Sequence, residues 1–567
     1  MFQFISSKKK AKLSEQNKVS TKEITKVLSV ALIYLIGLIL WANSNGALGI
    51  PRNDDAFYLR TAFHFAKSGN FVPISAYPTL IGQTIISAPV IKIFGENIAA
   101  LQTFCAFLGV TGLVFIYLLF RDFLVWYHST ICVAVLALGP IFSNLSISYM
   151  TDIPAFAFQA AGIFLLSRSL VAKSKNLFWL IGSFLATATA FTIRQTTIST
   201  VAVILVVLFI YRDRHIFKAR VIVPIAVLFC VSLVFFYTWR ASLAEFQNFP
   251  VDTEKFHNPA YLVVSSVLSL GMTYGIYLFP IVLLINPIAL LKSFKKCEIY
   301  AALIGGFAIC YVFLQVRPKP NGNYFSQFVP VQAAVKASSH DLLYGWEWQL
   351  IQVVGLVCTG YFLIVSGLWC RRKFANPKKL TESFVVASVS LFSLGGLLVG
   401  AFGGAGFDRY GFLVIPLSAA LLLRLSDELD VLFRYNHWKS LAWCALVLVY
   451  GARAFDASTR YDGGAWRIAE QLTKRGADPL SIDGGYPWFA FYQSDVDNLE
   501  IDKFALWFKF SEDQSLTTQN EEAIINKICY VSRVYGTDPG DQKVSELNVS
   551  GLFGWKAHFE LHKRAEC

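Results

Sequence analysis

Long apolar segments dominate this chain from residue 25 to residue 453. A membrane-spanning helix needs about 20 mostly apolar residues. Across all 567 residues, 55% are hydrophobic and only 15% are charged, whereas a soluble protein has about 25% charged residues. The sequence therefore predicts an α-helical polytopic membrane protein with about 13 transmembrane helices. The expected spans are 25–43, 97–120, 129–147, 153–171, 177–193, 196–211, 220–238, 262–290, 299–315, 348–369, 382–404, 409–425 and 438–453.

The stretch 177–211 is read as a helical hairpin. One helix of that length, at about 1.5 Å per residue, would be far longer than a bilayer core. The sequence "TIRQTT" interrupts it, and both flanks are basic, "KSKN" before it and "YRDRHIFK" after it. Two basic flanks on the same side of a membrane require two crossings, which places Arg194 at the hairpin tip.

The basic residues indicate the orientation. They concentrate in the tail 1–24 and in alternate loops such as "SRSLVAKSK", "KSFKK" and "RRKFANPKK". Cytoplasmic loops carry such an excess, so we expect a multi-pass protein of the plasma (inner) membrane with a cytoplasmic N-terminus. The net charge of +13 is then explained by these loops, and we expect the lipid bilayer, and no nucleic acid, as a partner.

The chain divides into three parts. Residues 1–24 form a cytoplasmic basic tail, and residues 25–453 form a transmembrane domain with a large first outer loop, 44–96. Residues 454–567 lack any span and contain helix-like "AWRIAEQLTKRG" and strand-like "KICYVSRVY". They predict a small extracytoplasmic α/β domain, in which Cys529 and Cys567 could form a disulfide or stay reduced.

Two adjacent acids, Asp54 and Asp55, open the first outer loop. One interpretation is structural: Asn53 can cap a helix, acids favour its first turn, and Gly69 is placed to end it. The other interpretation is chemical, with one carboxylate held rigidly over a cavity at the membrane surface. The helix would bury an apolar face made of Leu59, Ala62, Phe63 and Ala66.

Other charged residues are expected at the same outer boundary. Asp152 begins the fourth span, Arg194 lies at the hairpin tip, and Arg409 lies between the eleventh and twelfth spans. Each alone is explained by helix capping or by a side chain that reaches the interface, but charge at the edge of a bilayer usually marks a site. Cations suit an anionic leaving phosphate, and a carboxylate can deprotonate an acceptor hydroxyl or amine. Together they suit sugar transfer from a lipid phosphate.

The motifs resemble those of the GT-C class of integral-membrane glycosyltransferases. "DDAFYLRTAFHFAKSGNF" resembles the acidic first-loop motif, "MTDIPAFAF" the Thr-Asp-x-Pro motif, "FTIRQ" the basic hairpin position, and "DRYGFLVIPLSAALL" a late Arg-Tyr segment. "SIDGGYPWFAFY" is similar to a stretch of the extracytoplasmic domain of bacterial members. The resemblance is to glycosyltransferase family 39, the group of polyprenyl- or dolichyl-phosphate-mannose protein mannosyltransferases and lipid A aminoarabinose transferases.

The resemblance implies a hexosyl or pentosyl transferase with a polyprenyl-phosphate sugar donor and inversion at the sugar. A first-loop acid would be the general base, with Asp54 and Asp55 both open, and Asp152 would be a second catalytic acid. Arg194 and Arg409 would lie near the lipid phosphate. Two further residues are expected to bind the donor, Tyr410 beside Arg409 and Arg317 in a later outer loop. The acceptor could be a protein, a lipid or a polysaccharide.

No metal or cofactor site is evident in the sequence. It has no HExxH or similar ligand spacing, so we expect no cofactor and no tightly bound metal, with a divalent cation left as a lesser alternative. A different function class is a multi-pass transporter or a flippase of lipid-linked sugars. Such a path would place ionisable residues at mid-membrane depth, whereas here they gather at the outer rim. A catalytically inactive relative that binds glycans is a third reading.

Overall fold

Helices make up most of the part of the chain that the structure, a computed structural model, describes. About half of the expected span 196–211, most of 299–315 and all of 382–404 lie outside that part. The described residues are 19–73, 79–171, 176–201, 204–205, 219–243, 259–296, 299–300, 311, 324, 343, 345–374, 409, 412–433, 437–493, 506, 519–533, 541–565 and 567.

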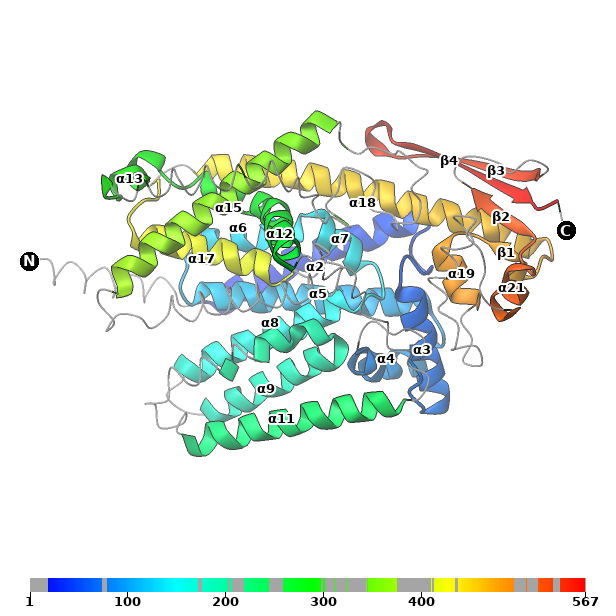
Figure 1. Cartoon of the computed structure of the whole chain (residues 1–567), viewed down its shortest axis with the longest axis horizontal. Helices are drawn as coiled ribbons and strands as arrows, with labels where there is room; N and C mark the ends of the chain where they lie inside the picture. Colours follow the sequence, from blue (N-terminus) through cyan, green and yellow to red (C-terminus); the bar gives the residue numbers. More distant parts are fainter. Residues whose placement is uncertain are drawn as a thin grey trace, which may run out of the picture.

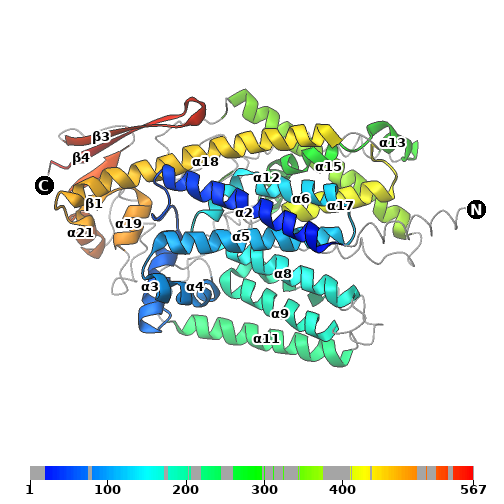
Figure 2. The same cartoon turned by 180° about the vertical axis from the view of Figure 1, so that it is seen from behind.

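The helices form an elongated bundle. Helices α5, α8, α9, α11 and α18 run along its long axis (Figures 1 and 2). The bundle helices are α2 (Thr21–Ser44), α5 (Ile98–Arg121), α6 (Trp126–Ala137), α7 (Pro140–Ser146), α8 (Asp152–Val171), α9 (Asn176–Ile193), α11 (Ala219–Ser242), α12 (Pro259–Val282), α13 (Pro287–Lys292), α15 (Gly345–Phe374), α17 (Val414–Glu428) and α18 (His437–Lys474).

The helices bear out a polytopic α-helical membrane protein. Among the described residues, five helices are long and apolar enough to cross a membrane, namely α2, α5, α8, α15 and α18, and a sixth span is possible if α6 and α7 form one. Many large apolar side chains, such as Ile33 and Phe235, are exposed on the outside of the bundle, where lipid would contact them. The total of about 13 spans stays a prediction, because several expected spans fall outside the described residues.

Three expected boundaries differ from the structure. The helix expected at 129–147 is bent by 65° between α6 and α7, because Pro140 lacks an N–H and begins a new helix at its first turn. The helix expected at 262–290 ends at Val282, and α13 follows. The boundary set at 454 falls inside α18, which runs unbroken from His437 to Lys474.

A small sheet lies at the end of the bundle where α3 and α4 also lie (Figure 1). Its strand order is β1-β2-β4-β3, with β1 and β2 parallel and the other pairs antiparallel. Phe559 and Leu561 of β4 pack on Ile468 of α18 in one buried cluster. The elements of this end are α3 (Asp55–Ser68), α4 (Ile81–Phe94), η6 (Pro479–Ser481), β1 (Ile482–Asp483), α19 (Tyr486–Gln493), α21 (Gln519–Ile525), β2 (Tyr530–Arg533), β3 (Gln542–Ser550), η8 (Leu552–Gly554) and β4 (Lys556–Lys563).

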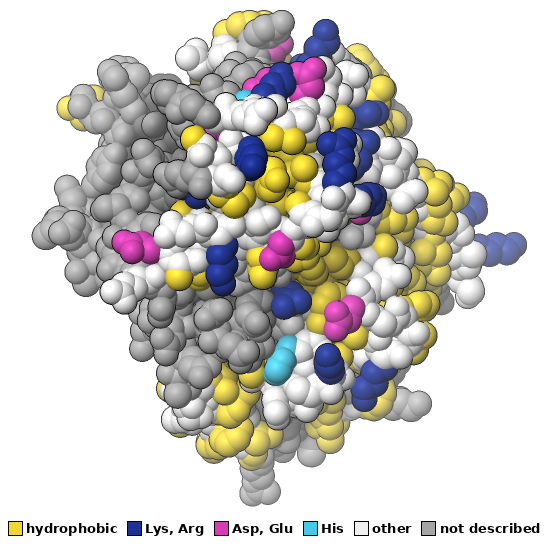
Figure 3. All heavy atoms as spheres, turned by 90° about the vertical axis from the view of Figure 1, so that its right-hand side faces the viewer, with side chains coloured by type: hydrophobic (Ala, Val, Ile, Leu, Met, Phe, Trp, Pro, Cys, Tyr) yellow, Lys and Arg dark blue, Asp and Glu magenta, His cyan; other side chains and the backbone are white. Residues whose placement is uncertain are grey.

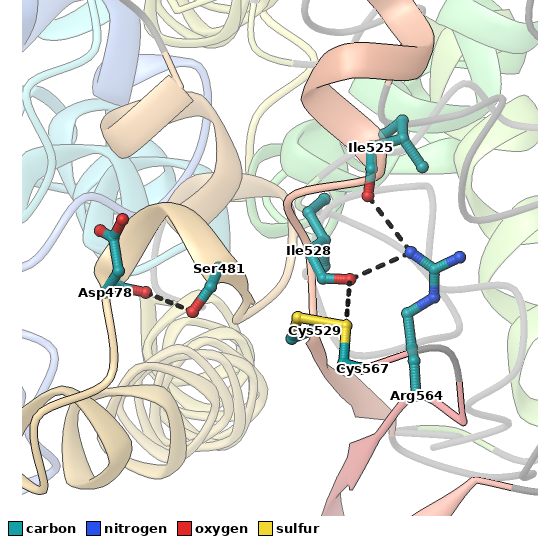
Figure 4. The surroundings of a disulfide bond; sticks show 7 residues. All are labelled: Asp478, Ser481, Ile525, Ile528, Cys529, Arg564 and Cys567. Atoms are coloured by element: carbon teal, nitrogen blue, oxygen red, sulfur yellow. Dashed lines mark hydrogen bonds between the residues drawn. A yellow bond between two sulfur atoms is a disulfide. The ribbon is translucent and has the colours of Figure 1, made fainter.

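A disulfide and a set of arginine hydrogen bonds hold this end of the molecule together. Cys529 and Cys567 form a disulfide (Figure 4), which confirms one of the two alternatives expected for these cysteines. Arg564 donates hydrogen bonds to the carbonyl oxygens of Ile525 and Ile528, at 3.2 and 3.0 Å. The C-terminal residues are thereby tied to the segment that leads into β2.

Asp456 of α18 joins the sheet to the first span. Its carboxylate is fully buried and accepts hydrogen bonds from Trp41 Nε1 at 2.8 Å and Asn45 Nδ2 at 3.1 Å, both in or just after α2. The backbone N–H of Leu552, which leads into β4, donates to the same carboxylate. A buried carboxylate is stable only with such partners, so α18 fixes the sheet relative to the bundle.

Candidate functional site

Helix α3 carries the two adjacent acids at its N-terminus. Asp54 occupies the N-cap position but makes no side-chain cap, and the helix begins at Asp55. The expectation that Asn53 caps this helix is wrong, because Asp54 occupies the N-cap position. The Asn53 Nδ2 donates to Tyr324 Oη at 2.9 Å. Gly69 ends the helix as expected, with φ of 74° and its N–H bonded to Phe65 O at 2.8 Å. Of the predicted apolar face, Leu59, Ala62 and Phe63 are buried and Ala66 is partly buried.

Asp55 is a buried acceptor of backbone hydrogen bonds. Its Oδ1 accepts from the N–H groups of Arg52 at 2.8 Å and Asn53 at 3.0 Å, and its Oδ2 accepts from the N–H of Tyr149 at 3.1 Å. Burial raises the pKa of this carboxyl to about 6, although the three donors and the Arg52 charge oppose that rise. Its side chain is fully buried, so Asp55 fixes the backbone of the loop and presents no oxygen to solvent.

Asp54 faces the opposite way, toward charged and polar side chains. Arg409 Nη2 lies 3.4 Å from Asp54 Oδ2, and Tyr486 Oη donates to Asp54 Oδ1 at 3.2 Å. The Asp54 side chain keeps 20% of its surface exposed, whereas that of Arg409 keeps 7%. Asp54 is thus held between a cation and a phenol and remains open to an incoming molecule.

Asp152 and Arg194 form a second buried pair. Asp152 begins α8, and Arg194 follows the last residue of α9 in an extended conformation. Arg194 Nη1 lies 2.9 Å from Asp152 Oδ2 and donates to Thr151 Oγ1 at 2.7 Å. Their side chains are 1% and 11% exposed for Asp152 and Arg194. At this degree of burial both charges have lost most of their hydration, and each is stable only because the other compensates its charge.

Tyr58 brings the two pairs into one cluster. It lies one turn into α3 and is 3% exposed. Burial raises its pKa well above the usual value, so the phenol stays protonated. Four charged groups also act on its titration, so all four lie in the same part of the molecule: Asp54, Asp152, Arg194 and Arg409.

Arg52 supports the loop that carries Asp54, and sequence reasoning missed it. Its Nε lies 2.8 Å from Asp462 Oδ2 on α18, and its side chain is 4% exposed. Its two terminal nitrogens reach the carbonyl oxygens of Asn144 and Ile147 and the hydroxyl of Ser458. The only sequence signal was its position directly before the two acids. Tyr486 was likewise missed, although it lies in the quoted stretch "SIDGGYPWFAFY".

The structure brings together Asp54, Asp152, Arg194 and Arg409 from the expected site. Tyr410 and Arg317 lie outside the described residues. Within the described part of the chain, one group could hold a metal ion, Glu546, His558 and Glu560. It lies on the terminal sheet, where the Lys543 ammonium already contacts both glutamates. Figure 3 views this end of the molecule, where charged side chains surround apolar patches.

Comparison with known proteins supports the resemblance for part of the chain. A family model described as dolichyl-phosphate-mannose-protein mannosyltransferase matches residues 82–239. This segment includes Asp152 and Arg194 but neither Asp54 nor Arg409. Over these residues the match confirms the resemblance to the GT-C class of membrane glycosyltransferases. No curated protein matches the chain.

Three solved structures resemble the chain at low identity. ArnT from Cupriavidus metallidurans in the apo state is 12% identical, with 95% of this chain and 98% of that chain covered and a TM-score of 0.39. The same protein bound to undecaprenyl phosphate is 13% identical, with 96% and 98% covered and a TM-score of 0.39. The archaeal oligosaccharyltransferase AglB from Archaeoglobus fulgidus, in complex with an inhibitory peptide and a dolichol-phosphate, is 11% identical, with 90% and 69% covered and a TM-score of 0.44.

Proposed function

We propose that this protein transfers a sugar from a polyprenyl-phosphate donor to an acceptor at the outer face of the membrane, with Asp54 as the general base. The observation that carries the proposal is the cluster around Tyr58, in which two carboxylate–guanidinium pairs meet at one end of the bundle. Asp54 is the more exposed of the two adjacent acids, whereas both carboxylate oxygens of Asp55 accept hydrogen bonds from backbone N–H groups. This difference supports Asp54 over Asp55 as the base.

The reaction needs a base for the acceptor's proton and positive charge for the leaving phosphate, and the cluster contains groups for both. The acceptor oxygen or nitrogen attacks the anomeric carbon as the bond from that carbon to the phosphate oxygen breaks. The acceptor's proton passes to Asp54, and the phosphate leaves with the bonding electrons. Arg409 and Arg194 compensate the charge that develops on the leaving phosphate. Attack opposite the leaving group inverts the sugar, and Asp152 holds Arg194 in place through their 2.9 Å contact.

The distribution of charge favours a transferase over a transporter or flippase. Between their first and last turns, α5, α8, α9 and α12 contain no Asp, Glu, Lys or Arg. The ion pairs of α5 and α8 lie at helix ends, Arg121 with Glu23 and Arg168 with Asp122. A conduction path needs ionisable groups at mid-membrane depth, and these helices offer none.

We further propose that the cluster and the terminal sheet face the outside of a plasma membrane, with the N-terminus in the cytoplasm. The Cys529–Cys567 disulfide supports this, since disulfides persist in oxidising compartments. The test is a thiol label applied to intact cells after a membrane-impermeant reductant. Labelling of both cysteines is expected, and labelling only after permeabilisation would contradict the orientation.

The function is tested by mass spectrometry of membrane lipids and surface glycans. Cells carry the wild-type chain, a deletion, Asp54→Asn or Asp55→Asn. In the deletion strain, one glycan should lose a single sugar while a polyprenyl-phosphate sugar accumulates. Asp54→Asn should reproduce this, because loss of a general base costs about 100-fold or more in rate.

Asp55→Asn is the matched control, because the two acids are neighbours with different surroundings. It should restore the glycan in proportion to the amount of folded protein in the membrane. A normal glycan profile from Asp54→Asn at normal protein level would refute Asp54 as the base. A profile unchanged even by the deletion would refute the transferase function.

A further inference from the structure

Helix α19 of the terminal region docks directly on α3. The Phe57 and Tyr486 rings meet edge to face, with centroids 6.0 Å apart. The Arg60 guanidinium lies over the Phe491 ring, 5.7 Å from its centroid. Tyr486 is 2% exposed. Aromatic and cation–π contacts of this kind hold one helix against another at a fixed distance, so α19 cannot shift without moving away from α3.

The turn before α19 sets the position of Tyr486. Gly485 has a φ of 92°, a conformation that suits glycine, and its N–H bonds to Asp483 Oδ1 at 3.0 Å. A Cβ at Gly484 would come within 2.7 Å of the Ala469 Cβ on α18. The two glycines therefore let the chain leave β1, pass close to α18 and begin α19 at Tyr486. The sequence "DGGY" therefore determines where α19 begins and where Tyr486 lies.

We propose that Tyr486 is a positioning residue for Asp54, so that the terminal domain completes the active site. This inference rests on the proposed function of Asp54. The Tyr486 hydroxyl donates to one carboxylate oxygen and Arg409 holds the other, which fixes the plane of the carboxylate.

The hydrogen bond from Tyr486 to Asp54 is charge-assisted. A hydrogen bond to a carboxylate is shorter and stronger than one between neutral groups. Charged and polar groups near Asp54 include Arg409, Tyr58 on its own helix, and the pair of Asp152 and Arg194. Removing the Tyr486 hydroxyl changes one of these contacts and leaves the charges in place.

The test compares Tyr486→Phe with Tyr492→Phe and Asp54→Asn. Tyr492 lies on the same helix, and its replacement removes a hydroxyl that does not contact Asp54. The donor probe is the polyprenyl-phosphate sugar extracted from the deletion strain, and the acceptor is membranes of that strain. The rate of donor consumption is measured against donor concentration, with thermal unfolding followed in parallel.

Tyr486→Phe is expected to lower kcat about tenfold, with little change in the KM for the donor, since one hydrogen bond to a charged group is lost. Tyr492→Phe should retain the wild-type kcat and KM. A variant that is only destabilised would lose rate in proportion to the loss of folded protein and keep the wild-type kcat per folded molecule.

The outcomes separate the two proposals. If Asp54→Asn is inactive while Tyr486→Phe keeps the wild-type kcat per folded molecule, the positioning role is overturned and the function of Asp54 stands. If Asp54→Asn itself remains active, the proposed function fails, and the role of Tyr486 fails with it.

Discussion

Arg52 offers the most direct test of how the site is supported. Its guanidinium is nearly fully buried and connects the first outer loop to α18 through Asp462 and Ser458. It also reaches backbone carbonyls at the end of α7. The informative change is Arg52→Met, which keeps most of the side-chain volume but removes the charge and all of its donors.

The magnitude follows from the groups left behind. Asp462, whose side chain is 10% exposed, would lose its cationic partner. Breaking a buried ion pair by removing one partner costs about 3–5 kcal/mol. That is a large share of the 5–15 kcal/mol that is typical of the whole free energy of unfolding. The double variant Arg52→Met with Asp462→Asn removes the stranded charge, and we expect it to recover about half of the loss.

The assay uses the buried thiols of the bundle. A thiol-reactive dye reports unfolding of the detergent-solubilised protein when Cys105, Cys132, Cys358 and Cys444 become accessible. Arg467→Met is the matched control, because Arg467 is an exposed arginine on α18, the helix that carries Asp462. Its effect on the free energy of unfolding should stay within about 0.5 kcal/mol. The reasoning is refuted if Arg52→Met is as stable as Arg467→Met, or if the double variant is no more stable than Arg52→Met.

Three further predictions concern the disulfide, metal and pH. Cys529→Ser opens a loop of 38 residues and should destabilise the terminal domain by up to about 4 kcal/mol, read as faster limited proteolysis at this end; unchanged proteolysis would contradict this. EDTA should leave donor consumption within about twofold of the untreated rate, since in the proposed mechanism guanidinium groups rather than a metal ion compensate the charge of the leaving phosphate; a loss restored by added divalent cation would refute it. Because burial raises the pKa of Asp55 to about 6, above the ~3.9 of an unfolded chain, the folded state takes up this proton first. The free energy of unfolding should then rise as pH falls from 7 toward 4, and Asp55→Asn should lack that part of the rise.

The sequence was sufficient for the helices and for the end of the bundle that carries charge. Apolar length predicts a span directly, so α2, α5, α8 and α9 match their expected ranges within a few residues. Asp152 and Arg194 were found because charge next to an apolar segment is rare and costly. These signals are local, and each can be read without knowing what packs against it.

The separate roles of Asp54 and Asp55 could not be read from the sequence. Asp55 is a buried acceptor because the N–H of Tyr149, 94 positions away, points at it. Asp54 is oriented by Tyr486, 432 positions away. Both acids have the same local sequence environment, so only the tertiary arrangement distinguishes them. The Asn53 cap was wrong because the helix begins one residue later than expected, with Asp54 at the N-cap position.

The continuity of α18 explains why the terminal domain and the membrane bundle act as one support for the site. A Cβ at Gly463 would lie 2.2 Å from the Asn45 carbonyl oxygen, so the helix passes directly against the start of the first outer loop. Asp462, the residue before Gly463, and Ser458, just over one turn earlier, hold Arg52. Further along α18, Ile468 packs beneath the sheet, whose strands precede and follow α19. The loop that carries Asp54 and the helix that carries Tyr486 are therefore both held in position by contacts with α18. Since that helix has no break at which one part could move independently, the distance between Asp54 and Tyr486 is set by rigid packing rather than by a hinge.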